Sequence, residues 1–488
     1  MRPGPVVARA TAPPLTHRGG QSALVGALVL VVVVVGMVSS LGAPLIPAIA
    51  EERGVSPASA QWSLVITLLT GAVAAPVLGR LGDGPRRRPV ILVTLALVGV
   101  GCVLAAPDGG LGVLLTGRAL QGLGLGLMPL AMAVARDHLE EERVRGAVML
   151  LSISTVAGAG IGYPVSGALA AVGGVGASFW FGAVVVAGCL AVAVRVLPDG
   201  NHLTRSPLDV RGAVLLGAAV AGALLALSQG RQWGWASPLV LALVTGSALL
   251  FTLWTLHERR VQDPLVDLRL LRQRPVLVAH VTALAAGVGL YLLLSSVSWL
   301  LQSPGNGAGI GLGQSPLVAA CAMVPFSVTS VATARLLVPW LAARVGDAWT
   351  MPLGCALFCA AMVGLALFRE ETWQVFVIMG VGGMGTGCTF SSMPAVIVGA
   401  VPPGEFGSAT GVNQVLRTIG YATGSAAFAA VLAAYADPRT GSTPAVGFDV
   451  AAYLGAAVFA ATALLDLLLV GQRRHRTRTL EPELLPPP

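Results

Sequence analysis

Long apolar segments separated by short polar ones fill the chain between residues 22 and 470. A helix needs about 20 apolar residues to cross the hydrocarbon core of a bilayer. Fourteen segments approach or exceed that length, at 22–47, 59–80, 89–106, 111–135, 147–172, 178–196, 209–228, 237–256, 275–300, 316–339, 350–368, 372–399, 408–435 and 448–470. The pattern therefore predicts an all-α polytopic membrane protein with fourteen spans and loops too short for a catalytic domain.

Composition narrows the class of protein further. Hydrophobic residues make up 55% of the 488 residues and charged residues only 11%, whereas a soluble domain carries about a quarter charged residues. The six cysteines all lie in apolar segments, which is typical of small buried side chains. We find no Ser–His pairing, His/Asp grouping or phosphate loop in the sequence, so we expect no enzyme activity, no cofactor and no metal.

The placement of the arginines predicts the orientation of the chain. All 30 basic residues are arginine, which indicates a GC-rich bacterial source. If the N-terminus is cytoplasmic, 24 arginines lie on the cytoplasmic side, four lie outside, and Arg118 and Arg417 fall within spans. This asymmetry follows the positive-inside rule and accounts for the net charge of +8, so we expect no nucleic-acid partner. It predicts a plasma-membrane protein with both termini in the cytoplasm.

Two halves can be recognised along the chain. The stretch "GRLGDGPRRRP" (79–89) follows the second span, and the weaker echo "PWLAARVGDAW" (339–349) follows the tenth. Parallel repeats of six helices are a transporter arrangement. We expect a cytoplasmic tail (1–20), an N-terminal six-helix bundle (21–196), two inserted helices with a cytoplasmic linker (197–274), a C-terminal six-helix bundle (275–470) and a second cytoplasmic tail (471–488).

Five motifs in order carry a family resemblance over nearly the whole chain. They are "GRLGDGPRRRPVI", "GRALQGLGLG", "GAGIGYPVSGAL", the pair "LSQGRQWGWASP" and "HERRVQDPLVDLRLL", and "GVNQVLRTIGYATGSA". Together they resemble the fourteen-span drug:proton antiporter branch of the major facilitator superfamily. The resemblance implies two six-helix bundles plus two extra central helices, and proton-coupled efflux by alternating access.

The loop between the second and third spans has two interpretations. Gly79 and Gly82 permit a tight turn and close helix approach, and the arginines hold it at the cytoplasmic surface, so the loop can be a topology anchor alone. The resemblance implies a conformational latch as well. Asp83 would then engage the start of the thirteenth span, and Arg87 would bridge Asp83 to Asp137 at the end of the fourth. The family's glycine before the basic pair is an arginine here.

Ionisable residues inside spans are functional candidates by default. Arg118 and Gln121 share a face of the fourth span, and the resemblance makes Arg118 a residue of proton coupling and the cavity wall. The alternative is a structural hydrogen bonder to carbonyls of the first span. Asn413, Gln414 and Arg417 of the thirteenth span either line the cavity or form a structural polar cluster.

The fifth span carries the signature that the family associates with antiporters. Gly158, Gly162 and Gly167 permit close helix packing, and Pro164 permits a kink. Tyr163 replaces the usual glycine before the proline. In the family this motif seals the inward path, which argues for export.

One departure from the branch bears on the substrate. Members of that branch usually carry an acid in the first span. The corresponding position here is Val38, and the span has no Asp or Glu. A lipophilic cation in a low-dielectric cavity requires a carboxylate partner, so two arginines without an acid favour neutral or anionic solutes. We interpret His280 and Asp466, near cytoplasmic span ends, as interfacial. Proton coupling could then use Asp137, Asp83 or a charge on the substrate.

We therefore expect a monomeric secondary active exporter of a hydrophobic small molecule, such as an antibiotic or secondary metabolite. Its partners are that molecule, protons and the lipid bilayer. The first alternative is a broad multidrug exporter of lipophilic cations, which the family name suggests. The second is a polytopic protein without transport activity, such as a sensor.

Overall fold

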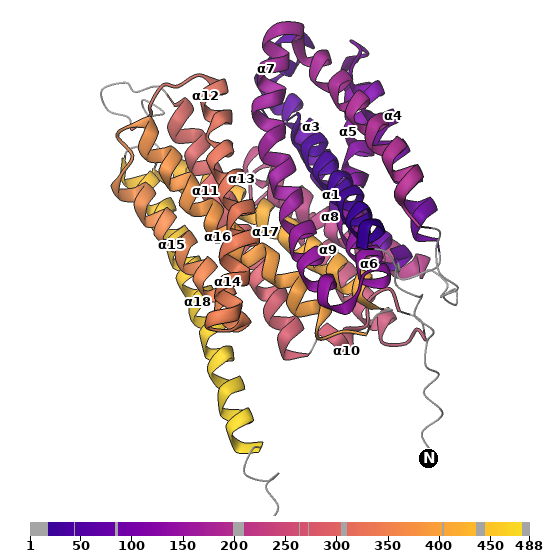
Figure 1. Ribbon diagram of the computed structural model, residues 1–488. Helices are drawn as coiled ribbons and strands as arrows, with labels where there is room; N and C mark the ends of the chain where they lie inside the picture. The colour runs from indigo at the N-terminus through magenta and orange to yellow at the C-terminus, as the bar shows by residue number, and fades with distance from the viewer. Residues whose placement is uncertain are drawn as a thin grey trace, which may run out of the picture.

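The structure is a computed structural model that describes residues 18–42, 44–82, 86–198, 209–262, 264–271, 273–303, 310–402, 405–435 and 445–480. These residues form helices and connecting turns, without a strand (Figure 1). The first half contains α1 (Arg18–Ser40), α2 (Ile46–Glu52), α3 (Pro57–Gly82), α4 (Arg87–Ala105), α5 (Gly110–Gly122), the 3₁₀ turn η1 (Leu123–Gly126), α6 (Leu127–His138) and α7 (Glu141–Val196). The predicted all-α class is confirmed.

The rest of the chain contains the two inserted helices and the second half. The helices predicted as the inserted pair are α8 (Val210–Trp233) and α9 (Pro238–Glu258). They are followed by α10 (Leu268–Leu271), α11 (Arg274–Gln302), α12 (Pro316–Cys321), α13 (Met323–Ala332), the π turn η2 (Thr333–Leu337), α14 (Val338–Arg344), the 3₁₀ turn η3 (Asp347–Trp349), α15 (Thr350–Leu367), α16 (Thr372–Val398), α17 (Phe406–Tyr435) and α18 (Ala445–Leu480).

Thirteen helical stretches of the described chain are long and apolar enough to cross a membrane. One of them, α7, has 56 residues, or about 84 Å at 1.5 Å per residue, nearly three times the thickness of a bilayer core. Its backbone breaks at Gly173 and at Gly174, whose φ of 72° is a conformation that suits glycine. The break separates the two segments predicted at 147–172 and 178–196, so the pattern of fourteen apolar segments is retained.

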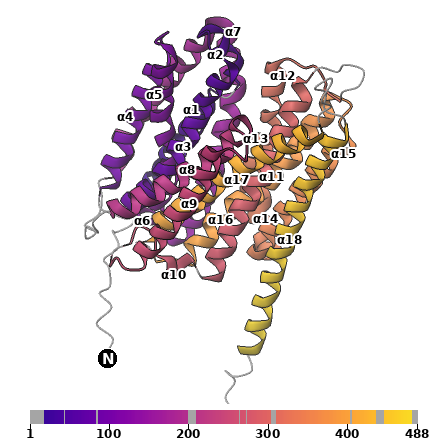
Figure 2. The ribbon, with the colours of Figure 1, turned by 180° about the vertical axis from the view of Figure 1, so that it is seen from behind.

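The two halves stand side by side, and the inserted helices lie across the seam between them (Figures 1 and 2). A separate apolar cluster joins Ala72 of α3, Leu216 and Val220 of α8, Trp254 of α9 and Val415 of α17. The inserted pair is thus packed against both halves.

Large apolar side chains are exposed on the outer faces of many helices. Examples are Val184 of α7 (71%), Val214 of α8 (64%) and Leu336 of η2 (72%). Helices satisfy their backbone polar groups internally, so such faces are suited to lipid rather than water. The chain is a membrane protein, and the bilayer supplies the missing contact for these faces.

Candidate functional site

Arg118 of α5 is fully buried in the first half, and each of its guanidinium nitrogens is hydrogen-bonded. Nη1 donates to the carbonyl of Val38 (3.2 Å) and to Oε1 of Gln121 (2.5 Å), and Nη2 donates to the carbonyl of Ser39 (2.8 Å). Nε donates to the carbonyl of Ser63 on α3 (3.1 Å). Arg118 therefore ties α5 to α1 and α3, which are the contacts expected of a structural hydrogen bonder.

The same contacts show the surroundings of Val38, where the resemblance predicts an acid. At Val38 only the backbone oxygen reaches Arg118, and the side chain is buried among apolar neighbours. Gln121 also donates to the carbonyl of Gly101 on α4 (3.2 Å). The centre of the first half thus holds a buried cation whose partners are neutral oxygens.

Glycines of α7 let it approach α1 closely. A Cβ atom built at Gly158 would lie 2.1 Å from the carbonyl oxygen of Val33, and one at Gly162 would lie 2.2 Å from Oγ of Ser40. Gly167 differs, because its nearest such neighbour is 3.8 Å away. The helix runs on through Pro164 without a break, so the kink predicted there is not seen; the residues of non-helical backbone are Gly173 and Gly174.

The second half repeats this close approach between α17 and α11. A Cβ atom at Gly424 would lie 2.1 Å from the carbonyl oxygen of Val288, and one at Gly420 would lie 2.4 Å from that of Leu284. Both glycines belong to the "GVNQVLRTIGYATGSA" motif. The motif therefore places α17 on α11 as the fifth-span motif places α7 on α1.

The predicted latch is only partly visible. Arg87 at the start of α4 forms an ion pair with Asp137 at the end of α6. Gly79 permits contact between the halves, since a Cβ atom there would lie 2.5 Å from the carbonyl oxygen of Gly407 at the start of α17. Asp83 lies outside the described residues, and Gly82 is the last residue of α3.

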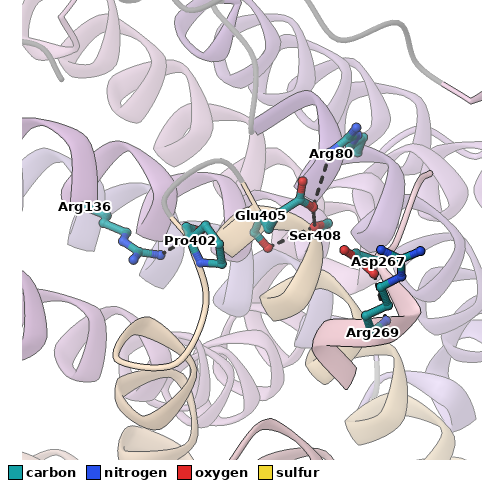
Figure 3. Close-up of polar contacts among 7 residues, drawn as sticks. All are labelled: Arg80, Arg136, Asp267, Arg269, Pro402, Glu405 and Ser408. Carbon is teal, nitrogen blue, oxygen red and sulfur yellow. Dashed lines mark hydrogen bonds and ion pairs between the residues drawn. The ribbon is translucent and has the colours of Figure 1, made fainter. Parts of the chain in front are cut away.

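Three further arginines join the halves at the end of the molecule where these basic loops lie, which we call the arginine-rich end. Figure 3 shows two of them, Arg80 and Arg136. Arg80 of α3 forms an ion pair with Oε2 of Glu405 (3.5 Å), which immediately precedes α17. Ser408 on the first turn of α17 donates to the carbonyl oxygen of Glu405 (3.0 Å). The pair thus holds the start of α17 against α3.

Arg136 of α6 binds the carboxyl end of α16. Its Nη2 donates to the carbonyls of Val398 (3.1 Å) and Val401 (2.8 Å), and its guanidinium lies 4.9 Å from the ring centre of Phe406. A cation at a helix C-terminus satisfies free carbonyls and complements the helix dipole. This contact also crosses from the first half to the second.

Arg145 of α7 forms an ion pair with Asp347, which begins η3. Asp347 occupies the aspartate position of the "PWLAARVGDAW" echo. The second-half echo of the loop therefore also reaches across to the first half. Sequence reasoning treated Arg80, Arg136 and Arg145 only as topology signals, because pairing between distant segments has no local pattern.

Arg417 of α17 is buried in the second half, with 2% of its surface exposed. Its guanidinium lies 4.0 Å from the ring centre of Phe390, and Nε (3.3 Å) and Nη2 (3.2 Å) both donate to the hydroxyl of Tyr421. Nη1 has no hydrogen-bond partner within the described chain. Unlike Arg118, Arg417 retains a free donor, which suits an anion or another acceptor.

Two residues interpreted from the sequence as interfacial, Asp466 and His280, are buried between helices. Asp466 of α18 is 2% exposed and accepts a hydrogen bond from Thr282 of α11 (2.9 Å), with Sγ of Cys355 on α15 at 3.9 Å. His280 of α11 is 4% exposed, and its Nδ1 lies 3.3 Å from Nδ2 of Asn413. Hydropathy locates a residue along a span but not around it, so the sequence alone could not predict this burial.

Asn413 and Gln414 lie on the turn of α17 before Arg417 and are both buried. Asn413 donates to the carbonyl of Ala279 on α11 (3.0 Å), whereas Oε1 of Gln414 has no partner in the part of the chain described. Within the same part, His, Cys, Asp and Glu form no group of three that could bind a metal ion. The buried polar cluster on α17 is built from an arginine, two amides and the hydroxyl of Tyr421.

Comparison with known proteins defines the class. The family model of the Major Facilitator Superfamily matches residues 28–368 and 279–486, so the chain belongs to this superfamily of membrane transporters. The resemblance drawn from the five motifs is confirmed at that level.

Particular relatives are bacterial resistance proteins. The chain is 27% identical over 397 residues to the multidrug resistance protein Stp of Mycobacterium tuberculosis, covering 80% of this chain and 72% of Stp. It is 29% identical over 483 residues to the puromycin resistance protein pur8 of Streptomyces alboniger, covering 91% and 90%. The crystal structure of the human organic anion transporter MFSD10 shares the fold, with a TM-score of 0.64, 18% identity, and 92% and 99% coverage.

Proposed function

We propose that this protein is a proton-coupled exporter of a hydrophobic small molecule that is neutral or anionic, such as an antibiotic or secondary metabolite. Membership of the superfamily and the resistance proteins among its relatives support export of such compounds. The glycines that hold α7 against α1 lie in the motif that the antiporter resemblance assigns to export.

We infer the charge of the substrate from two buried arginines that face no acid. Arg118 and Arg417 are 0% and 2% exposed, and neither forms an ion pair within the described residues. A cationic substrate would add a third positive charge to a low-dielectric interior, where unpaired charges are costly. An anionic substrate meets a favourable field, a neutral one adds no further charge, and the free Nη1 of Arg417 offers either of them a donor.

We propose that Gly79, Gly82, Asp83, Arg87 and Asp137 act as the conformational latch. Ion pairs from Arg80 and Arg145, with the Arg136 contacts, support a state closed at the arginine-rich end. If that end is cytoplasmic, as the arginine asymmetry predicts, the structure corresponds to a state closed toward the cytoplasm. Both termini would then be cytoplasmic in the plasma membrane, and the protein would act as a monomer.

For proton coupling, Asp466 joins Asp83 and Asp137 as a candidate, beside a charge carried by the substrate. Asp466 (2% exposed) and Glu258 (4%) are the most deeply buried carboxylates in the described chain. Asp466 contacts a hydroxyl and a thiol, and no cation pairs with it among the described side chains. A carboxylate buried without a counter-charge is suited to exchanging protons. Arg118 and Gln121 would act in coupling by holding α5 to α1.

A compound-accumulation assay tests the proposal. Cells that lack their own drug exporters would express wild type or Arg118→Ala, and uptake of an aromatic carboxylate, its neutral amide and the matching amine would be followed. We expect wild type to lower accumulation of the carboxylate or amide. Exclusion of the amine alone would replace this proposal with the broad exporter of lipophilic cations. Equal accumulation of all three compounds in both strains would contradict export of this class.

A further inference from the structure

A pocket of about 450 Å³ lies between α3, α8 and α17, with Tyr291 of α11 at one side. Its walls therefore come from both halves and from one of the two inserted helices. The polar residues Gln61 of α3 and Gln232 of α8 are among its lining residues, and their side-chain amides are 3.5 Å apart. The apolar wall includes Leu64 and Leu68 of α3.

The lining of this pocket carries positive charge only. Arg231, near the end of α8, is the charged residue among those that line it, and no Asp or Glu belongs to that lining. The Arg231 side chain is exposed and has no ion-pair partner in the described part of the chain. A cation next to low-dielectric walls attracts anions more strongly than it would in open water.

Trp235 is held against the end of α8 by the local backbone. A Cβ atom at Gly230 would lie 2.5 Å from the indole of Trp235, so only glycine permits the ring to pack there. Gly234, with a φ of 85°, provides the turn that returns the chain over the end of α8. The indole thus lines the same pocket as Arg231, as an apolar surface for a ring system.

Tyr421 supplies a hydrogen-bond donor at another point of the wall. Its hydroxyl oxygen accepts from Nε and Nη2 of Arg417, and arginine has no acceptor to offer in return. The hydroxyl proton of Tyr421 is therefore available to another acceptor. Its ring stacks on Tyr291 with centroids 4.5 Å apart, which fixes the hydroxyl in place.

We propose that this pocket binds the exported molecule and that the molecule is an amphipathic organic anion. Its apolar rings lie against the leucines and Trp235, its acidic group lies near Arg231, and a carbonyl or similar acceptor bonds to Tyr421. The inference rests on the proposed export function and narrows its substrate class from neutral or anionic to anionic.

The proposal also assigns a function to α8, one of the two inserted helices. One face of α8 packs on α3 and α17, and the last turns of the same helix supply Leu224, Ser228 and Arg231 to the pocket lining. The helix completes a binding wall that two six-helix bundles alone would leave open.

Cysteine labelling tests the pocket without knowing the substrate. Ser228 of α8 lines the pocket and is changed to cysteine after the half-exposed Cys321 and Cys359 are changed to serine. The probes are sulfonatoethyl methanethiosulfonate, an anion, and its trimethylammonium analogue, a cation, each normalised to its rate with free cysteine. We expect a preference of about fivefold for the anionic probe, which corresponds to about 1 kcal/mol.

Adding Arg231→Gln to this background should abolish the preference. The matched control is Arg369→Gln, which removes an arginine that is paired with Asp449 and does not line the pocket, and it should leave the preference unchanged. Equal normalised rates with both probes before Arg231 is changed would overturn the anionic assignment. Failure of Ser228→Cys to react with either probe would overturn the existence of an accessible pocket.

Transport kinetics separate this inference from the function on which it rests. For a carboxylate that wild type exports, Arg231→Gln should raise KM about fivefold with little change in kcat, and Trp235→Ala should raise KM as well. If wild type exports the carboxylate and both variants have wild-type KM, the pocket assignment fails while the function stands. If wild type exports no carboxylate, the proposed export of anions is contradicted, whatever the labelling shows.

Discussion

Arg118 and Arg417 are both buried arginines, but their surroundings differ. Four acceptors surround Arg118, two of them carbonyls of α1. Arg417 bonds to one hydroxyl, stacks over Phe390 and keeps one nitrogen free. The first geometry favours a residue that positions helices, and the second favours a residue that meets a ligand.

For Arg118→Ala we expect transport to fall at least about tenfold, because hydrogen bonds from a charged donor contribute about 1.5–3 kcal/mol each. Arg118→Lys keeps the charge but cannot make the forked contacts, so it should rescue little activity. Efflux of a transported compound would be measured, with membrane insertion checked by detergent chromatography. Full activity of Arg118→Lys would show that transport requires the positive charge and not the several hydrogen bonds of the guanidinium group.

Asp466 offers a test of proton coupling at a single residue. Asp466→Asn keeps an acceptor for Thr282 but removes the titratable group. We expect this variant to exchange substrate across proteoliposomes at equal pH about as well as wild type. A pH gradient should no longer drive net export by it. Gradient-driven export at the wild-type rate would exclude Asp466 as the coupling site.

At the scale of helices, glycines decide where α7 and α1 can touch. Gly158→Ala would place a methyl group 2.1 Å from the carbonyl oxygen of Val33 unless the helices moved apart. Overpacking of this kind costs about 1–3 kcal/mol. The matched control is Gly167→Ala, which has open space. We expect a lower thermal midpoint in detergent for Gly158→Ala and an unchanged one for Gly167→Ala, and equal midpoints would contradict the close-packing account.

The helices themselves could be predicted from the sequence because apolar length is a local property. Segments such as 275–300 and 372–399 correspond to α11 and α16 within a few residues. The burial of Asp466 could not be predicted in this way, because its environment depends on how α18 rotates against α11 and α15. The Arg136 contacts with α16 join residues more than 260 positions apart, which no local pattern encodes.

At the scale of the whole molecule, alternating access requires the contacts at the arginine-rich end to break and re-form. Arg136→Gln removes the cation that binds the end of α16. Charged hydrogen bonds contribute about 1.5–3 kcal/mol each, so we expect the closed population to fall severalfold. Spin labels on Glu142→Cys and Ala343→Cys would report this opening as a longer distance distribution. The same distribution as in wild type would mean that Arg136 does not hold this end closed.

A second contact at the same end is exposed and should matter less. The Arg145–Asp347 pair is 46% exposed on each side, and exposed pairs contribute about 0–1 kcal/mol. Arg145→Asp should open this end slightly, and the added Asp347→Arg should restore the wild-type distance distribution. If the double variant were as open as the single one, the Arg145–Asp347 pair would not stabilise the closed state.

The central claim is proton-driven export of a neutral or anionic molecule, and one measurement tests it most directly. Inverted membrane vesicles holding an acid interior and a fluorescent pH probe would receive matched carboxylates, amides and amines, with Arg118→Ala vesicles as control. The account predicts that a carboxylate or an amide dissipates the gradient in wild type only. Dissipation of the gradient by amines alone would contradict the account. So would a gradient that persists with every compound that cells expressing the protein exclude.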